Sequence, residues 1–102
     1  MNKFGLPEQT IAILTAIFAE ESAVETVILY GSRAKGTYKN GSDIDLTLTG
    51  DRLTEALRSR LAQKCEEASI PYEIDLSLLG QIQNKELKDH IQRVGTVFYS
   101  KQ

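Results

Sequence analysis

Cysteine, proline and tryptophan are scarce in this chain of 102 residues, which has one Cys, two Pro and no Trp. The single Cys65 excludes a disulfide within the chain and a cysteine-rich zinc site. No apolar run approaches the ~18 residues that a membrane-spanning helix needs, so we expect no membrane segment. The first residues also lack the apolar stretch of a signal peptide, which favours a cytoplasmic location.

Neither sign of charge dominates, because 12 Lys and Arg stand against 14 Asp and Glu, for a net charge of −2. This balance argues against a protein that mainly coats nucleic acid, so we expect no direct nucleic-acid binding. A site that binds phosphate through metal ions stays possible. Apolar residues make up 41% of the chain and charged residues 25%, a composition typical of a folded protein. Its length predicts a single domain over residues 1–102.

The spacing of apolar residues predicts alternating helices and strands. A helical pattern follows Pro7 and stops near residue 20, and an apolar run over residues 24–30 then predicts a strand. A turn and a glycine-bounded loop over residues 31–41 separate it from an alternating segment at residues 43–49. This second strand is expected to be half-buried, with its polar side in solvent.

The second half of the chain continues the alternation. Asp51 is expected to cap a helix whose apolar stripe extends over residues 53–68. A strand over residues 72–78 follows, then a helix capped by Asn84, and a closing strand at residues 97–99. Because a short turn joins the first two strands, we predict an α/β (α+β) fold with a small mixed β-sheet flanked by helices.

Gly31 and Ser32 stand where the first predicted strand ends and a helical turn begins. Backbone N–H groups at such a turn lack partners within the strand or helix, and glycine lets a phosphate approach closely. The Ser32 hydroxyl adds a further donor. An ordinary strand-to-helix turn explains the same residues equally well, so this feature alone leaves both interpretations open.

Acidic residues recur at matching positions of two predicted strands. Asp43 and Asp45 share a face because residues i and i+2 of a strand point the same way. Such paired carboxylates suit Mg²⁺ or Mn²⁺, although a solvated strand face shows the same pattern. Residues 73–76 (Glu-Ile-Asp-Leu) repeat the pattern of residues 43–46 (Asp-Ile-Asp-Leu), and Asp75 stands at the place of Asp45. Neighbouring strands would gather the three acids into a two-metal site for phosphoryl transfer.

A Gly-Ser pair, ten further residues and an Asp-x-Asp motif together resemble the signature of the DNA polymerase beta-like nucleotidyltransferase superfamily. The matching strings are Gly31-Ser32-Arg33-Ala34-Lys35-Gly36 and Ser42-Asp43-Ile44-Asp45-Leu46. They are similar to those of the minimal nucleotidyltransferases, the MNT or MntA group of prokaryotes. The resemblance includes Asp75 and the order of the elements. Lys35 stands where arginine is frequent, which keeps the charge but loses bidentate geometry.

The resemblance implies a role for each residue of the motif. The turn at residues 31–32 (Gly-Ser) would hold the nucleotide phosphates. Arg33 is expected at the surface beside the acids, where it would either contact the nucleotide or act as a structural counter-charge. Asp43 and Asp45 would bridge two Mg²⁺ ions, with Mn²⁺ as the alternative. Asp75 would hold one metal and help deprotonate an attacking hydroxyl. The α-phosphate of ATP or another nucleoside triphosphate would be displaced in line, with release of pyrophosphate.

A partner protein is implied as well. Larger members of the superfamily have a second domain that binds the acceptor, and a chain of this length is expected to lack one. The minimal members are similar to antitoxins of HEPN-domain RNases, which implies AMP transfer to a tyrosine of a HEPN toxin encoded nearby. One alternative is a non-catalytic module that neutralises a HEPN partner by contact, and another is nucleotidylation of a small molecule. Homo- or hetero-oligomers are compatible with each, and the base preference stays open.

Three single residues outside the motif are expected to be structural. Cys65 lies on the apolar stripe of its helix and is predicted to be in the core. His90 is adjacent to apolar positions of the last helix and is predicted to be solvated or hydrogen-bonded rather than a ligand or base. Tyr30 is expected to pack beneath the turn that follows it.

Overall fold

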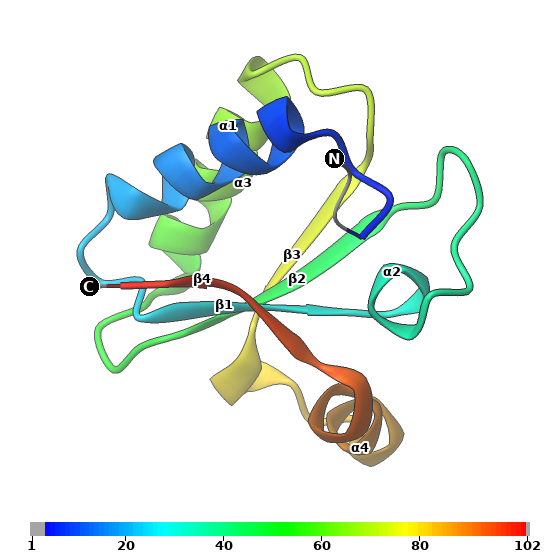
Figure 1. The fold of residues 1–102 in the computed structure, drawn as a ribbon. Helices are drawn as coiled ribbons and strands as arrows, with labels where there is room; N and C mark the ends of the chain where they lie inside the picture. Colours follow the sequence, from blue (N-terminus) through cyan, green and yellow to red (C-terminus); the bar gives the residue numbers. More distant parts are fainter. Residues whose placement is uncertain (1–3, 102) are drawn as a thin grey trace.

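The computed structural model describes residues 4–101, whose strands form one four-stranded sheet (Figure 1). The elements are α1 (Glu8–Ala19), β1 (Thr26–Tyr30), α2 (Ser32–Lys35), β2 (Ile44–Thr49), α3 (Glu55–Glu67), β3 (Ile74–Leu78), the 3-10 helix η1 (Leu79–Gln81), α4 (Lys85–Val94) and β4 (Thr96–Ser100). Their order agrees with the predicted one, to which η1 is the addition. Among the described residues, no helix is both long and apolar enough to cross a membrane.

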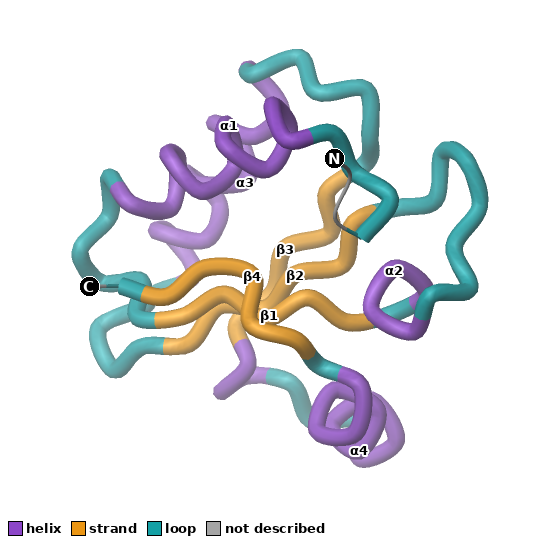
Figure 2. Tube along the Cα trace, in the orientation of Figure 1, coloured by secondary structure: helices purple, strands orange, loops and turns teal. Residues whose placement is uncertain are grey.

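The sheet is mixed, as predicted, and its strand order is β3-β2-β1-β4. Strand β1 pairs antiparallel with β2 and β4, whereas β2 pairs parallel with β3. Figure 2 shows α1 and α3 on one side of the sheet and η1 with α4 on the other. The short passage from β1 through α2 to β2 gives the antiparallel pair, and the longer crossover through α3 gives the parallel pair.

The hydrophobic core lies between the sheet and the two helices α1 and α3. Alternate residues of the central strands, such as Leu29 and Leu46, point into it and are fully buried. Phe18 of α1 and Leu61 of α3 pack in the same cluster. Cys65 is buried there as expected, and this burial raises the pKa of its thiol to about 11, so the thiol is protonated at neutral pH.

The opposite face of β2 is less open to solvent than the alternation suggested. Thr47 has an exposed fraction of 0%, and the Ser77 hydroxyl of β3 donates to its side-chain oxygen at 2.9 Å. The expectation of a solvated polar side is therefore wrong at Thr47. The reason is that β2 lies between two other strands and that η1, on the side of the sheet opposite α1 and α3, contacts β2.

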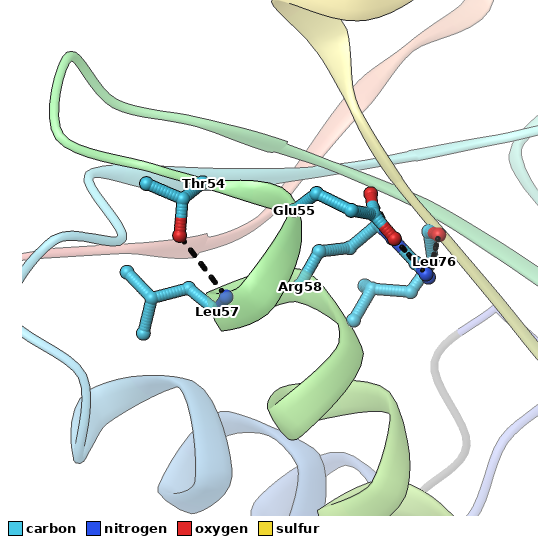
Figure 3. Close-up of polar contacts among 5 residues, drawn as sticks. All are labelled: Thr54, Glu55, Leu57, Arg58 and Leu76. Atoms are coloured by element: carbon cyan, nitrogen blue, oxygen red, sulfur yellow. Dashed lines mark hydrogen bonds and ion pairs between the residues drawn. The ribbon is translucent and has the colours of Figure 1, made fainter.

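The two expected helix caps have different outcomes. Asn84 caps α4, since its Oδ1 accepts from the Leu87 N–H at 2.9 Å. The assignment of Asp51 as the cap of α3 is wrong, because the helix begins at Glu55. Thr54 is the cap, and its hydroxyl oxygen accepts from the Leu57 N–H at 3.1 Å (Figure 3). Asp51 and Thr54 are both good capping residues, and the later of the two is the one used.

Arg58 joins α3 to the outer edge of the sheet. Its guanidinium forms an ion pair with Glu55 at 2.6 Å and donates through Nη1 to the Leu76 carbonyl at 3.2 Å (Figure 3). Leu76 belongs to β3, the edge strand that carries one of the candidate site residues. A backbone carbonyl at an edge is otherwise free to pair with another chain, so this contact both anchors β3 and covers part of its edge.

Candidate active site

The register of the sheet aligns three polar residues across neighbouring strands. Tyr30 of β1 is the partner of Asp45 in β2, and Asp45 is the partner of Asp75 in β3. All three therefore lie on the face opposite the main core, at the end of β1 from which the turn at Gly31 departs. Asp43 is exposed and comes directly before β2. The expected proximity of Asp45 and Asp75 is present, while their catalytic roles stay predictions.

The acidic residues influence one another electrostatically. Partial burial raises the pKa of the Asp45 carboxyl, and the negative charges of Asp75 and Asp43 raise this pKa further. His90 acts in the opposite direction, but more weakly. Ionisation of Asp45 therefore costs free energy in the folded protein, and a cation bound among these carboxylates would lower that cost.

The donor set fits a hard cation that keeps other ligands. In the part of the chain that the structure describes, no three Asp, Glu, His or Cys side chains are placed to hold a metal ion unaided. Mg²⁺ is usually bound by one or two carboxylates together with substrate phosphates and water, rather than by a complete protein cage. Carboxylates of Asp45 and Asp75 in strand register, with Asp43 beside them, meet this requirement if a nucleotide supplies the remaining oxygens.

Gly31 holds a backbone conformation that only glycine adopts easily. Its φ of 78° lies in the left-handed region, and a Cβ there would be 2.2 Å from the Asp45 Oδ2. The close approach brings the Gly31 peptide against the acidic cluster, with Ser32 beginning α2 immediately afterwards. A nucleotide phosphate bound at this turn would therefore lie beside the carboxylates that could hold its metal.

We expect Gly31→Ala to weaken MgATP binding at least tenfold, because the new methyl group displaces the Asp45 carboxylate. The Gly31 φ of 78° is combined with a ψ of −158°, which essentially only glycine adopts, so the substitution also costs roughly 1–3 kcal/mol of stability. Gly36→Ala is the matched control, since Gly36 has a φ of 82° but a Cβ added there would meet no atom within 4 Å. Urea unfolding should show the larger loss in Gly31→Ala, and calorimetric titration at a temperature where both variants are folded should show weakened MgATP binding in Gly31→Ala alone. Equal MgATP affinities of Gly31→Ala and Gly36→Ala would show that the turn is not part of the nucleotide site.

His90 reaches this turn from α4. The Gly31 N–H donates to the His90 Nε2 at 3.0 Å, and the imidazole ring meets the Tyr30 ring edge-on, with centroids 6.1 Å apart. The expectation of a hydrogen-bonded histidine is confirmed, but sequence analysis missed the partner. The available signal is helical spacing, because His90 lies three residues after Leu87 and four before Val94 and so shares a side of the helix with these apolar residues.

Tyr30 packs beneath the turn as expected and belongs to a small polar network. Burial raises the pKa of its hydroxyl, the charges of Asp75 and Asp45 raise it as well, and a hydrogen bond with Ser77 lowers it. The hydroxyl is thus neutral at physiological pH. The Ser77 hydroxyl donates its hydrogen to the Thr47 side chain, so Tyr30, Ser77 and Thr47 form a line of hydroxyl groups on the sheet face that carries Asp45 and Asp75.

Arg33 has a structural position that differs from the expected one. Only 3% of the residue is exposed, and its Nε and Nη2 donate to the Ser42 carbonyl at 3.2 and 2.9 Å. Nη1 donates to the Phe4 carbonyl at 3.0 Å, and the rings of Tyr38 and Tyr72 lie within about 5 Å of the guanidinium. The expectation of a surface arginine is wrong. Its donors bind backbone carbonyls rather than being free for a phosphate, so Arg33 fixes the loop before β2.

Arg33→Ala is expected to destabilise the protein by about 2–4 kcal/mol, because the partly buried carbonyls of Phe4 and Ser42 lose charged donors and two tyrosine rings lose their contact. Lys35→Ala is the control, since Lys35 is an exposed cation two residues away and its removal should change stability by less than about 0.5 kcal/mol. Urea unfolding monitored by circular dichroism checks both values. Equal stabilities would contradict a structural role for Arg33.

Comparison with known proteins gives the class to which this fold and site belong. Residues 13–102 match the family model described as polymerase beta, nucleotidyltransferase. The chain therefore belongs to the polymerase beta nucleotidyltransferase family and is a nucleotidyltransferase. Within the family its similarity is to the minimal nucleotidyltransferases, as the resemblance implied: it is 29% identical over 101 residues to the probable protein adenylyltransferase MntA of Haemophilus influenzae, a match covering 98% of this chain and 88% of the relative.

Solved structures agree with this assignment. A toxin–antitoxin complex with AMP-PNP contains a chain that is 26% identical, with a TM-score of 0.69 over 95% of this chain and 76% of that one. A chain from the complex of a tri-AMPylated Shewanella oneidensis HEPN toxin with MNT antitoxin matches in fold, with 20% identity and a TM-score of 0.68. That match covers 93% of this chain and 73% of the other.

Proposed function

We propose that this protein transfers AMP from ATP, with Mg²⁺, to a hydroxyl of a HEPN-type partner toxin, and so acts as its antitoxin. The observation that carries the proposal is the alignment of Asp45 and Asp75 beside a glycine turn whose backbone touches the Asp45 carboxylate. The names of its relatives supply the partner class, since one is called a protein adenylyltransferase and others form toxin–antitoxin complexes. A tyrosine acceptor and a cytoplasmic location are part of the proposal.

The chain's own residues divide the work of the reaction. The N–H of Gly31 and the hydroxyl of Ser32 hold phosphate oxygens, and carboxylates of Asp43, Asp45 and Asp75 are the ligands for Mg²⁺. When bound, the metal supplies positive charge against the triphosphate. Asp75 accepts the proton of the attacking hydroxyl, whose oxygen bonds to the α-phosphorus. The bond from that phosphorus to the bridging oxygen breaks, and pyrophosphate leaves.

Neutralisation by contact alone is the second candidate, and one surface feature favours it. A groove of about 460 Å³ lies between α4 and strands β1 and β4, and its lining is mainly apolar. Val97 in its wall is 56% exposed, which is high for a large apolar side chain on an edge strand. Such a surface could bind a partner whether or not transfer occurs.

The test is incubation of the protein with ATP, Mg²⁺ and the HEPN protein encoded in the adjacent reading frame, followed by mass spectrometry of both chains. We expect the partner's mass to increase by one or more AMP groups, and peptide mapping to place them on tyrosine. Parallel reactions with EDTA, with GTP, CTP or UTP, and with Asp45→Asn test whether transfer requires a metal ion, a particular nucleobase and the Asp45 carboxylate. If the partner is inactivated in the complex without being modified, AMP transfer is rejected and neutralisation by contact takes its place.

A further inference from the structure

The Gly31 N–H has an acceptor within the chain. His90 Nε2 is 3.0 Å from the Gly31 nitrogen, although the two residues are 59 positions apart in the sequence. The imidazole ring also meets the Tyr30 ring edge-on. Ile91, the next residue of α4, is buried, which anchors the helix against the sheet.

This contact fixes which nitrogen of the His90 ring faces the turn. Nε2 accepts this hydrogen bond through its lone pair, so the contact presents an unprotonated Nε2 to the Gly31 N–H. A peptide N–H has one hydrogen, and a phosphate oxygen bound to it would lie about 2.9 Å from the nitrogen, where Nε2 now lies. His90 and a phosphate oxygen therefore cannot both occupy this donor with good geometry.

We propose that His90 is an internal competitor for the nucleotide phosphate, which must leave Gly31 before the turn can bind its ligand. The proposal rests on the proposed function, in which the Gly31 N–H is a phosphate donor. Because Ile91 anchors α4, rotation of the His90 side chain is the movement required. His90 thus accepts the Gly31 N–H hydrogen bond until a nucleotide replaces it. The free energy of the bond that is lost opposes nucleotide binding, so the apparent affinity is lower than it would be without His90.

Nuclear magnetic resonance tests the contact itself. An N–H to N hydrogen bond transmits a scalar coupling between its two nitrogen nuclei, so ¹⁵N-labelled protein should show coupling between the Gly31 amide and His90 Nε2. We expect this coupling in the nucleotide-free protein and its loss on saturation with MgATP. A coupling that persists at saturation would overturn the competition.

Affinity measurements test the consequence. Removing one neutral hydrogen bond from the free state should make His90→Ala bind MgATP about two- to tenfold more tightly than the parent. His90→Gln is expected to bind like the parent, because its side-chain carbonyl oxygen can take the place of Nε2. Gln92→Ala, an exposed substitution on the same helix, controls for changes in helix stability and should leave the affinity unchanged.

The outcomes separate the two proposals. If the parent binds MgATP and His90→Ala binds equally or more weakly, the competition is overturned and the proposed function stands. If neither the parent nor His90→Ala binds MgATP while the coupling is present, the turn is no phosphate site, and both proposals fail. Tighter binding by Gln92→Ala to the same extent would assign the effect to the helix and would also overturn the role of His90.

Discussion

Asp45→Asn is expected to reduce nucleotidyl transfer by at least about a hundredfold, because the amide keeps the shape of the carboxylate but not its charge for a metal. Asp45 is the central acid of the cluster, with Asp75 beside it in strand register and the Gly31 backbone against its Oδ2. A transfer assay with the partner protein measures the loss. Asp51→Asn, an exposed acid outside the cluster, is the matched control and should keep full activity.

The same substitution is expected to stabilise the nucleotide-free protein by a few degrees of melting temperature. The pKa of Asp45 is raised in the folded state by burial and then by Asp75 and Asp43, so its ionisation opposes folding. This cost is fully present above the folded pKa and disappears as the pH falls below the unfolded value of about 3.9. The stabilisation should therefore be seen at pH 7 and shrink towards pH 4. A less stable Asp45→Asn at pH 7 would contradict the electrostatic argument.

Local patterns predicted the order of the elements and the mixed sheet because each signal lies within a few residues. Alternation of Ile44, Leu46 and Leu48 marks the core face of β2, and Asn84 marks the start of α4. The same patterns cannot choose between nearby alternatives. Asp51 and Thr54 are both capping residues, and only the path of the chain between β2 and α3 decides that the helix starts after Thr54.

Contacts between distant segments explain what sequence analysis missed. Charge in a polar loop suggested a surface arginine, yet Arg33 is buried because carbonyls of Phe4 and Ser42 surround its guanidinium. No local pattern gives that environment. His90 likewise has an ordinary helical neighbourhood, and its importance lies in a bond to Gly31 across 59 residues.

The acidic cluster was accessible to prediction for a specific reason. Asp45 and Asp75 stand at the same place in two similar short strings, so any parallel pairing in register brings them side by side. The sequence alone does not reveal how strongly they interact. That depends on how far Asp45 is withdrawn from water by Gly31 and the neighbouring strands, which the structure describes.

Asp75→Asn is expected to separate transfer from binding. Asp75 is exposed on the edge strand β3, so it can meet an incoming hydroxyl, whereas Asp45 and the Gly31 turn lie deeper in the site. Loss of an oriented base that is also a metal ligand should lower transfer at least about a hundredfold. Most of the MgATP affinity should persist, because Asp43, Asp45 and Gly31 are unchanged.

The partner complex should persist in Asp75→Asn too, since one exposed acid contributes little to a protein interface of ordinary size. A pull-down measures the complex, and growth of cells that express the partner toxin measures protection, with Asp51→Asn as the matched control. We expect the variant to bind the toxin yet fail to protect the cells, because the toxin stays unmodified. If Asp75→Asn instead restores growth as fully as the parent while its transfer activity is lost, neutralisation is stoichiometric. The groove between α4 and β4, rather than the acidic cluster, would then be the surface to mutate next.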